Sequence, residues 1–90
     1  MANSIREFKK EINYIFGEVI DEASFKQLVK PEIEDDTIET IIDEAVATYD
    51  DFNDKINAGR KAENKKAYYK QLEEEYVASV KTLIDKINAL

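Results

Sequence analysis

The chain has 90 residues, of which 43% are hydrophobic and 37% are charged, and its formal net charge is −7. This length supports a single folded domain, residues 1–90, and two glycines with one proline provide too few turn residues for an all-β protein. The lack of cysteine excludes disulfides and thiolate metal sites, and the lack of histidine removes the commonest general base and metal ligand.

The first predicted helix begins at Ser4, which forms a capping box with Glu7. Hydrophobic side chains then recur every three or four residues, as on the buried face of a helix. They are Ile5, Phe8, Ile12, Ile15, Phe16, Val19, Ile20 and Ala23. This stripe is wide enough to contact two neighbouring helices.

The residues that follow do not continue this stripe. At about 100° per residue, Phe25, Leu28 and Val29 lie well away from it, so a straight helix would expose them. Pro31 disfavours helical geometry in the residue before it. We therefore predict that the helix bends or restarts and that residues 24–30 form a short extra helical turn.

The second predicted helix follows Pro31 and is strongly amphipathic. Asp35 or Asp36 is expected to cap its start, with Glu39 closing a capping box from Asp36, and Gly59 is expected to end it in a left-handed cap. One face is apolar and comprises Ile38, Ile41, Ile42, Ala45, Tyr49, Phe52 and Ile56. The opposite side carries the acids Asp36, Glu39, Asp43, Asp50, Asp51 and Asp54.

The third predicted helix has an apolar face formed by Tyr69, Leu72, Tyr76, Val80, Leu83, Ile87 and Leu90. This face is rotated by about 145° from that of the second helix if both are drawn as one rod, so the chain must turn between Gly59 and Asn64. Asn64 is expected to start the third helix. Facing residue numbers should sum to about 121 across this turn, which pairs Phe52 with Tyr69. The predicted fold is an all-α, three-helix, up-down-up bundle.

The stretch "INAGRKAENKKAYYK", residues 56–70, concentrates basic side chains in an acidic protein. One interpretation is a nucleic-acid contact, with Tyr68 as a stacking platform beside the five bases Arg60, Lys61, Lys65, Lys66 and Lys70. The other is a helix-turn-helix corner whose charges balance nearby acids. Because the acidic helix beside it would repel phosphates, nucleic-acid binding is disfavoured.

Residues 32–54 carry ten acids and no base. Such a surface either keeps a helix hydrated or attracts a basic protein partner. For the second interpretation, the candidate partner-binding acids are Glu39, Asp43, Asp50, Asp51 and Asp54.

The five tyrosines divide into two groups by helical position. Tyr49, Tyr69 and Tyr76 lie on the apolar stripes and are predicted to pack in the core. Tyr14 and Tyr68 project away from those stripes and are predicted to be exposed. They are the candidates for a partner or dimer contact, and both a monomer and a homodimer remain open.

No arrangement in the sequence predicts catalysis, a cofactor or a metal site. The acids point outward without the histidines of a di-iron bundle, and "DDFNDKINAG" lacks the ligand spacing of an EF-hand. The serines have no histidine base beside them to activate them. No apolar run reaches the roughly 20 residues that span a bilayer, and the N-terminus does not resemble a signal peptide, so the expected location is the cytoplasm.

The runs "KKEINYIFGEVIDE", "IIDEAV" and "NKKAYYKQL" resemble a small family of uncharacterised bacterial all-helical proteins of about this length. The resemblance implies a bacterial, non-secreted protein and supplies no ligand or functional residue. Pediocin-type bacteriocin immunity proteins are similar only in size and helical class.

These features together predict a non-catalytic interaction or adaptor module that binds a basic partner through its acidic second helix. Two alternatives remain. One is a structural homodimer without a ligand, and the other is an immunity-like or antitoxin-like inhibitor of a basic protein.

Overall fold

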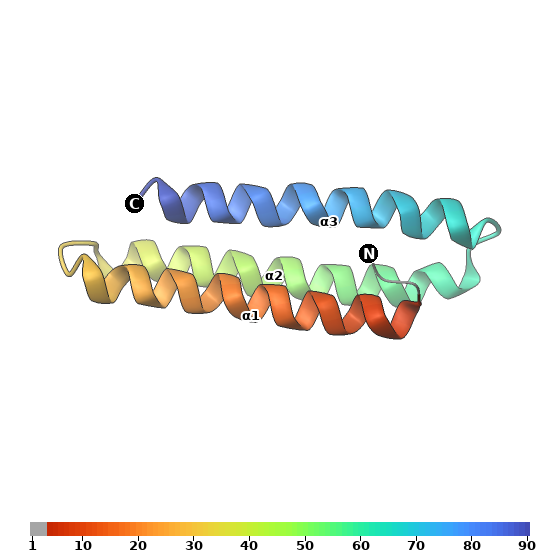
Figure 1. Ribbon diagram of the computed structural model, residues 1–90, viewed down its shortest axis with the longest axis horizontal. Helices are drawn as coiled ribbons and strands as arrows, with labels where there is room; N and C mark the ends of the chain where they lie inside the picture. Colours follow the sequence, from red (N-terminus) through yellow and green to blue (C-terminus); the bar gives the residue numbers. More distant parts are fainter. Residues whose placement is uncertain (1–3) are drawn as a thin grey trace.

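The computed structural model describes residues 4–90 as three long helices joined by short connections (Figure 1). They are α1 (Ile5–Val29), α2 (Asp35–Ala58) and α3 (Lys65–Asn88), and a 3₁₀ helix, η1 (Gly59–Lys61), follows α2 directly. The helices run up, down and up along a molecule of 50 × 20 × 17 Å. The predicted all-α, three-helix bundle is confirmed.

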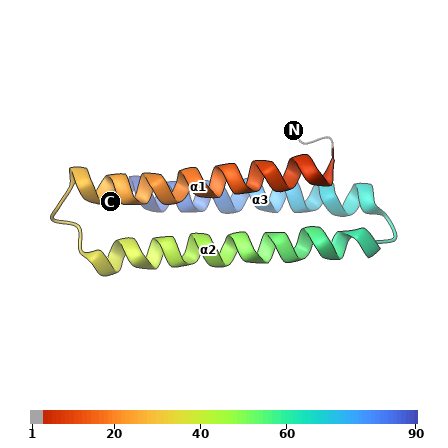
Figure 2. The same cartoon turned by 90° about the horizontal axis from the view of Figure 1, so that it is seen from below.

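Each helix packs against the other two. Figure 2, seen at 90° to Figure 1, shows α2 running antiparallel to α1 and α3. The C-terminus therefore lies at the end of the bundle where α1 connects to α2, and Lys30 Nζ donates a hydrogen bond to the Leu90 carbonyl oxygen there at 3.0 Å. Charged residues interrupt the apolar positions of every helix within residues 4–90, and none of these helices could span a bilayer.

Aromatic rings from all three helices meet in the middle of the core. Phe16 of α1 lies between Tyr49 and Phe52 of α2 and Tyr76 of α3, with ring centroids 5.9, 6.4 and 6.1 Å away. Tyr76 also makes edge-on contacts with Phe8 and Phe52. We call these five rings the aromatic cluster. Because every helix contributes at least one ring, the cluster holds all three in a fixed rotation about their own axes.

The predicted extra helical turn at residues 24–30 is wrong. α1 continues unbroken to Val29 and leaves Phe25, Leu28 and Val29 exposed at 57%, 78% and 56%. Breaking the helix would give up several backbone hydrogen bonds, whereas exposing scattered apolar side chains on a surface is common. The helix ends only where Pro31 prevents its continuation.

Two of the predicted helix starts are confirmed by their side-chain caps. The Ser4 hydroxyl accepts a hydrogen bond from the Glu7 backbone N–H at 3.2 Å. The Asn64 side chain accepts one from the Ala67 N–H at 3.1 Å and begins α3. Both caps satisfy backbone donors that a helix start leaves free.

The predicted cap of α2 is wrong. Glu34 occupies the cap position, and its side chain makes no capping hydrogen bond. Asp35 instead accepts a hydrogen bond from the Gln27 side-chain amide of α1. Tertiary contact with α1 has therefore replaced a local cap, while the acids of the first turn still favour the helix N-terminus.

Gly59 does not form the predicted left-handed cap, because its φ of −63° and ψ of −19° are right-handed helical values. It is needed for space. A Cβ at this position would lie 2.6 Å from Cε1 of Tyr68 and 2.7 Å from Cζ of Tyr69. Both rings are anchored, since their hydroxyls donate hydrogen bonds of 2.7 Å to the carbonyl oxygens of Lys55 and Ile56.

The predicted register between α2 and α3 is displaced by one to two helical turns. Tyr69 contacts the Ile56 carbonyl rather than Phe52, and Phe52 contacts Tyr76. The reason is that η1 extends the helical path beyond Gly59, so the chain reverses only before Asn64. A later reversal raises the sum of facing residue numbers.

The two glycines should respond oppositely to alanine. Gly59→Ala should lower the free energy of unfolding by about 2 kcal/mol, because the new methyl group displaces two hydrogen-bonded rings. Gly17 lies in the middle of α1 with no atom within 4 Å of a Cβ placed there, so Gly17→Ala should raise it by about 0.5–1 kcal/mol. Urea denaturation followed by circular dichroism measures both changes, and equal signs would contradict this assignment.

The aromatic cluster should make the protein sensitive to alkali. Burial raises the pKa of Tyr76 to about 12, and the nearby Glu11 carboxylate adds to the increase. An unfolded tyrosine ionises near pH 10, so between about pH 10 and 12 the unfolded state loses this proton more readily than the folded state. The stability that comes from burying the neutral Tyr76 is therefore complete below about pH 10 and is lost as the pH rises toward 12. Tyr76→Phe should therefore lose less stability over this range than the wild type. Thermal melts of the wild type and of Tyr76→Phe at each pH test this, and an equal loss of stability in both proteins would contradict it.

Candidate functional site

Five carboxylates line the outer side of α2, away from the core. Their spacings of three, four, seven and four residues place them on one helical face, and all five are exposed. They extend over about 27 Å at the helical rise of 1.5 Å per residue. We call this surface the acidic face, and its members are Asp36, Glu39, Asp43, Asp50 and Asp54.

Two neighbouring acids of α2 are engaged within the protein. Asp51, a predicted partner-binding residue, lies at the edge of the acidic face and forms an ion pair of 3.0 Å with Lys55. Glu44 forms an ion pair of 2.7 Å with Lys86 of α3, a contact between helices that the sequence analysis missed. No ion pair is formed by the acidic face within residues 4–90. The structure thus separates acids that support the bundle from acids that face outward.

Val46 and Ala47 interrupt the acidic face between Asp43 and Asp50. Val46 is 43% exposed, and Ala47 is exposed as well. A small apolar area therefore lies in the middle of the acidic face, with carboxylates on both sides along the helix. Interfaces commonly combine an apolar centre with a polar rim in this way.

The basic segment forms a corner between helices, as one of the two interpretations predicted. Its five bases are exposed, and none of them forms an ion pair with a carboxylate of the described chain. They therefore form no ion pair with Asp50, Asp51 or Asp54 at the end of α2, and Asp51 pairs with Lys55 of its own helix instead. The five bases are Arg60, Lys61, Lys65, Lys66 and Lys70.

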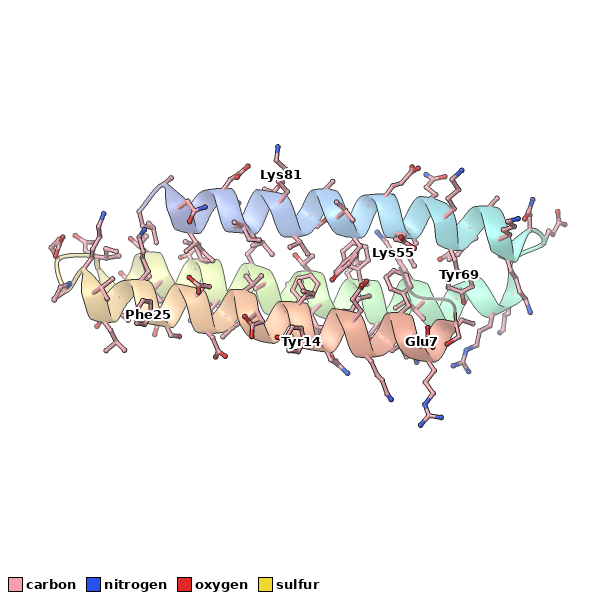
Figure 3. The ribbon with its side chains drawn as sticks, viewed as in Figure 1. Glu7, Tyr14, Phe25, Lys55, Tyr69 and Lys81 are labelled. Carbon is pink, nitrogen blue, oxygen red and sulfur yellow. The ribbon has the colours of Figure 1, made fainter. Side chains whose placement is uncertain are left out.

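A shallow groove runs between α2 and α3, and Lys55 lies in it (Figure 3). The hydrogen bond that its ammonium donates to Asp51 raises the pKa of Lys55. Its ammonium nitrogen also lies 5.6 Å from the centre of the Phe52 ring. The groove exists because small side chains face each other across it, namely Ala47, Thr48, Ala78 and Ser79. With its cation already paired, it presents no distinct ligand chemistry.

Only one of the two tyrosines predicted to be exposed is a surface residue. Tyr14 projects from α1 and is 67% exposed (Figure 3). Tyr68 is half-buried, because its ring packs edge-on against Tyr69 at 5.5 Å and its hydroxyl donates to the carbonyl of Lys55. The prediction for Tyr68 is wrong because the corner at Gly59 draws the ring onto α2.

The predicted core tyrosines are all drawn inward. Tyr76 is buried, whereas Tyr49 and Tyr69 are half-buried. The Tyr49 hydroxyl donates a hydrogen bond to the Asn13 side chain, and the Tyr69 hydroxyl donates one to the Ile56 carbonyl.

No group of three or more acidic side chains in residues 4–90 is arranged to hold a metal ion.

Comparison of the chain with models of protein families, with curated proteins and with solved structures finds no match. The resemblance to a bacterial helical family therefore stays a prediction.

Proposed function

We propose that this protein is a non-catalytic interaction module that binds a basic protein partner through the acidic face of α2. One observation carries the proposal: five exposed carboxylates share one helical face, and no cation in residues 4–90 pairs with them. Carboxylates without neighbouring cations keep their full electrostatic attraction for a partner.

The chemistry of this face favours a protein over other ligands. Its charge repels phosphates, and its acids lie in a line rather than around a cavity that could enclose a small molecule. A helix or extended segment with lysines or arginines along one side would match this line of charge. An apolar side chain in the middle of that segment would contact Val46, which is 43% exposed.

The charge of the whole protein assists the encounter. At a net charge of −7, the protein attracts a basic partner over a Debye length of about 8–10 Å at physiological salt. An inhibitor of a basic protein would use this same surface, so an antitoxin-like or immunity-like role is a special case of the proposal. We place the binding in the cytoplasm, the location that the sequence predicts.

Neutralising the acidic face should abolish this binding. Basic proteins captured from native lysate by the immobilised protein should be lost when Asp43, Asp50 and Asp54 are all changed to asparagine. For a captured partner, the Kd should rise about tenfold or more, since each ion pair at a surface contributes up to about 1 kcal/mol. Isothermal titration calorimetry measures this change.

A matched control removes the same number of charges elsewhere. Glu63→Gln, Glu74→Gln and Asp85→Asn together alter three exposed acids of the α2–α3 connection and α3. This triple variant should bind within about threefold of the wild type, because it leaves the acidic face intact. Equal losses in both triple variants, or binding that does not weaken as salt rises from about 50 to about 300 mM, would refute the proposal.

A further inference from the structure

A second surface lies on the outer side of α1, where four exposed residues form one stripe. Lys10, Tyr14, Gly17 and Asp21 are separated by four, three and four positions, which places them along one line of the helix. Tyr14 extends outward from the middle of this line (Figure 3). We call this set the α1 stripe.

Gly17 has no structural role inside the chain that explains the absence of a side chain. It is exposed in the middle of a long helix, and no atom lies within 4 Å of a Cβ placed on it. Glycine is among the poorest helix formers, so a helix without external contacts would favour alanine here. Glycine does allow a bulky group from outside to approach the helix backbone closely.

The α1 stripe is complementary to itself when reversed. Its outer positions are a cation and an anion, and its inner positions are a ring and a glycine. If two α1 helices lie antiparallel about a two-fold axis between positions 15 and 16, Lys10 faces Asp21 of the partner subunit. Tyr14 then faces Gly17 of the partner subunit, and each contact occurs twice, as a two-fold interface requires.

We propose that the protein forms a two-fold symmetric homodimer through the α1 stripe, with the Tyr14 ring of each copy over the glycine of the other. Charge selects this helix for self-association. α1 carries four basic and five acidic residues, so two copies of it repel each other far less than two copies of α2, which carries eight acidic residues and one basic residue. Two acidic faces would instead bring ten carboxylates together, since each copy has five.

Exposed apolar side chains extend the contact beyond the stripe. Phe25 and Leu28 lie four and seven residues after Asp21 and are 57% and 78% exposed. They lie on the same outer side of α1, and a second copy would remove part of their surface from water. The dimer uses no residue of the acidic face, so each dimer would present two such faces to a partner.

Charge reversal tests the dimer and its register. In sedimentation equilibrium, the average mass of the wild type should rise to that of a dimer as its concentration increases from about 1 µM to about 1 mM. Lys10→Asp or Asp21→Lys alone places like charges opposite each other twice, and each should raise the dimer Kd about tenfold or more. The double variant Lys10→Asp with Asp21→Lys restores both pairs and should return the Kd to within about threefold of the wild type.

Gly17 gives a second, independent measurement. Gly17→Gln should raise the thermal stability of the monomer, because glutamine favours a helix and open space surrounds the position. The same change should weaken the dimer about tenfold or more, since its side chain occupies the place of the Tyr14 ring. Lys81→Asp, on the exposed outer side of α3, is the control and should leave the dimer unchanged.

Three results would overturn the proposal. The first is a wild-type protein that stays monomeric over the whole concentration range. The second is a double charge reversal that fails to restore association although circular dichroism shows both single variants folded. The third is a Gly17→Gln variant that dimerises as tightly as the wild type.

Discussion

The packing of Phe16 against rings from both other helices is the constraint on which the rest of the structure depends. Three aromatic residues of α2 and α3 surround it. One of them, Tyr76, also contacts Phe8, which lies eight residues before Phe16 on α1. Rings of this size allow few alternative packings, so the rotation of each helix about its axis follows from this cluster. The direction of every outward-facing side chain is set by that rotation.

The fixed rotation divides the surface into regions of different charge. α2 turns five of its acids outward and directs Glu44 and Asp51 toward cations. α1 turns outward a line in which both signs and a glycine occur. The first surface is the one that we propose for a basic partner, and the second is the one that we propose for another copy of the protein. The two surfaces lie on different helices, so they can be occupied together.

Several features could be predicted from local rules alone. The apolar stripes identified three helices, and the caps at Ser4 and Asn64 appeared as predicted because capping involves residues three positions apart. The outward position of the acids followed from helical periodicity. Predictions failed where two segments meet, because Tyr68 is drawn onto α2 and Asp35 contacts Gln27 rather than capping a helix. The prediction of a break in α1 failed as well, since the helix continues to Val29.

The sequence by itself determined the helical class, the buried faces and the concentration of acid on α2, because these depend on the order of residues along one helix. Only the tertiary structure decided why each glycine is present. Gly59 makes room for Tyr68 and Tyr69, which approach from another helix, whereas Gly17 has open space around it. Both are single glycines in helical segments, and the physical difference between them is what lies within a few ångströms, which periodicity cannot report.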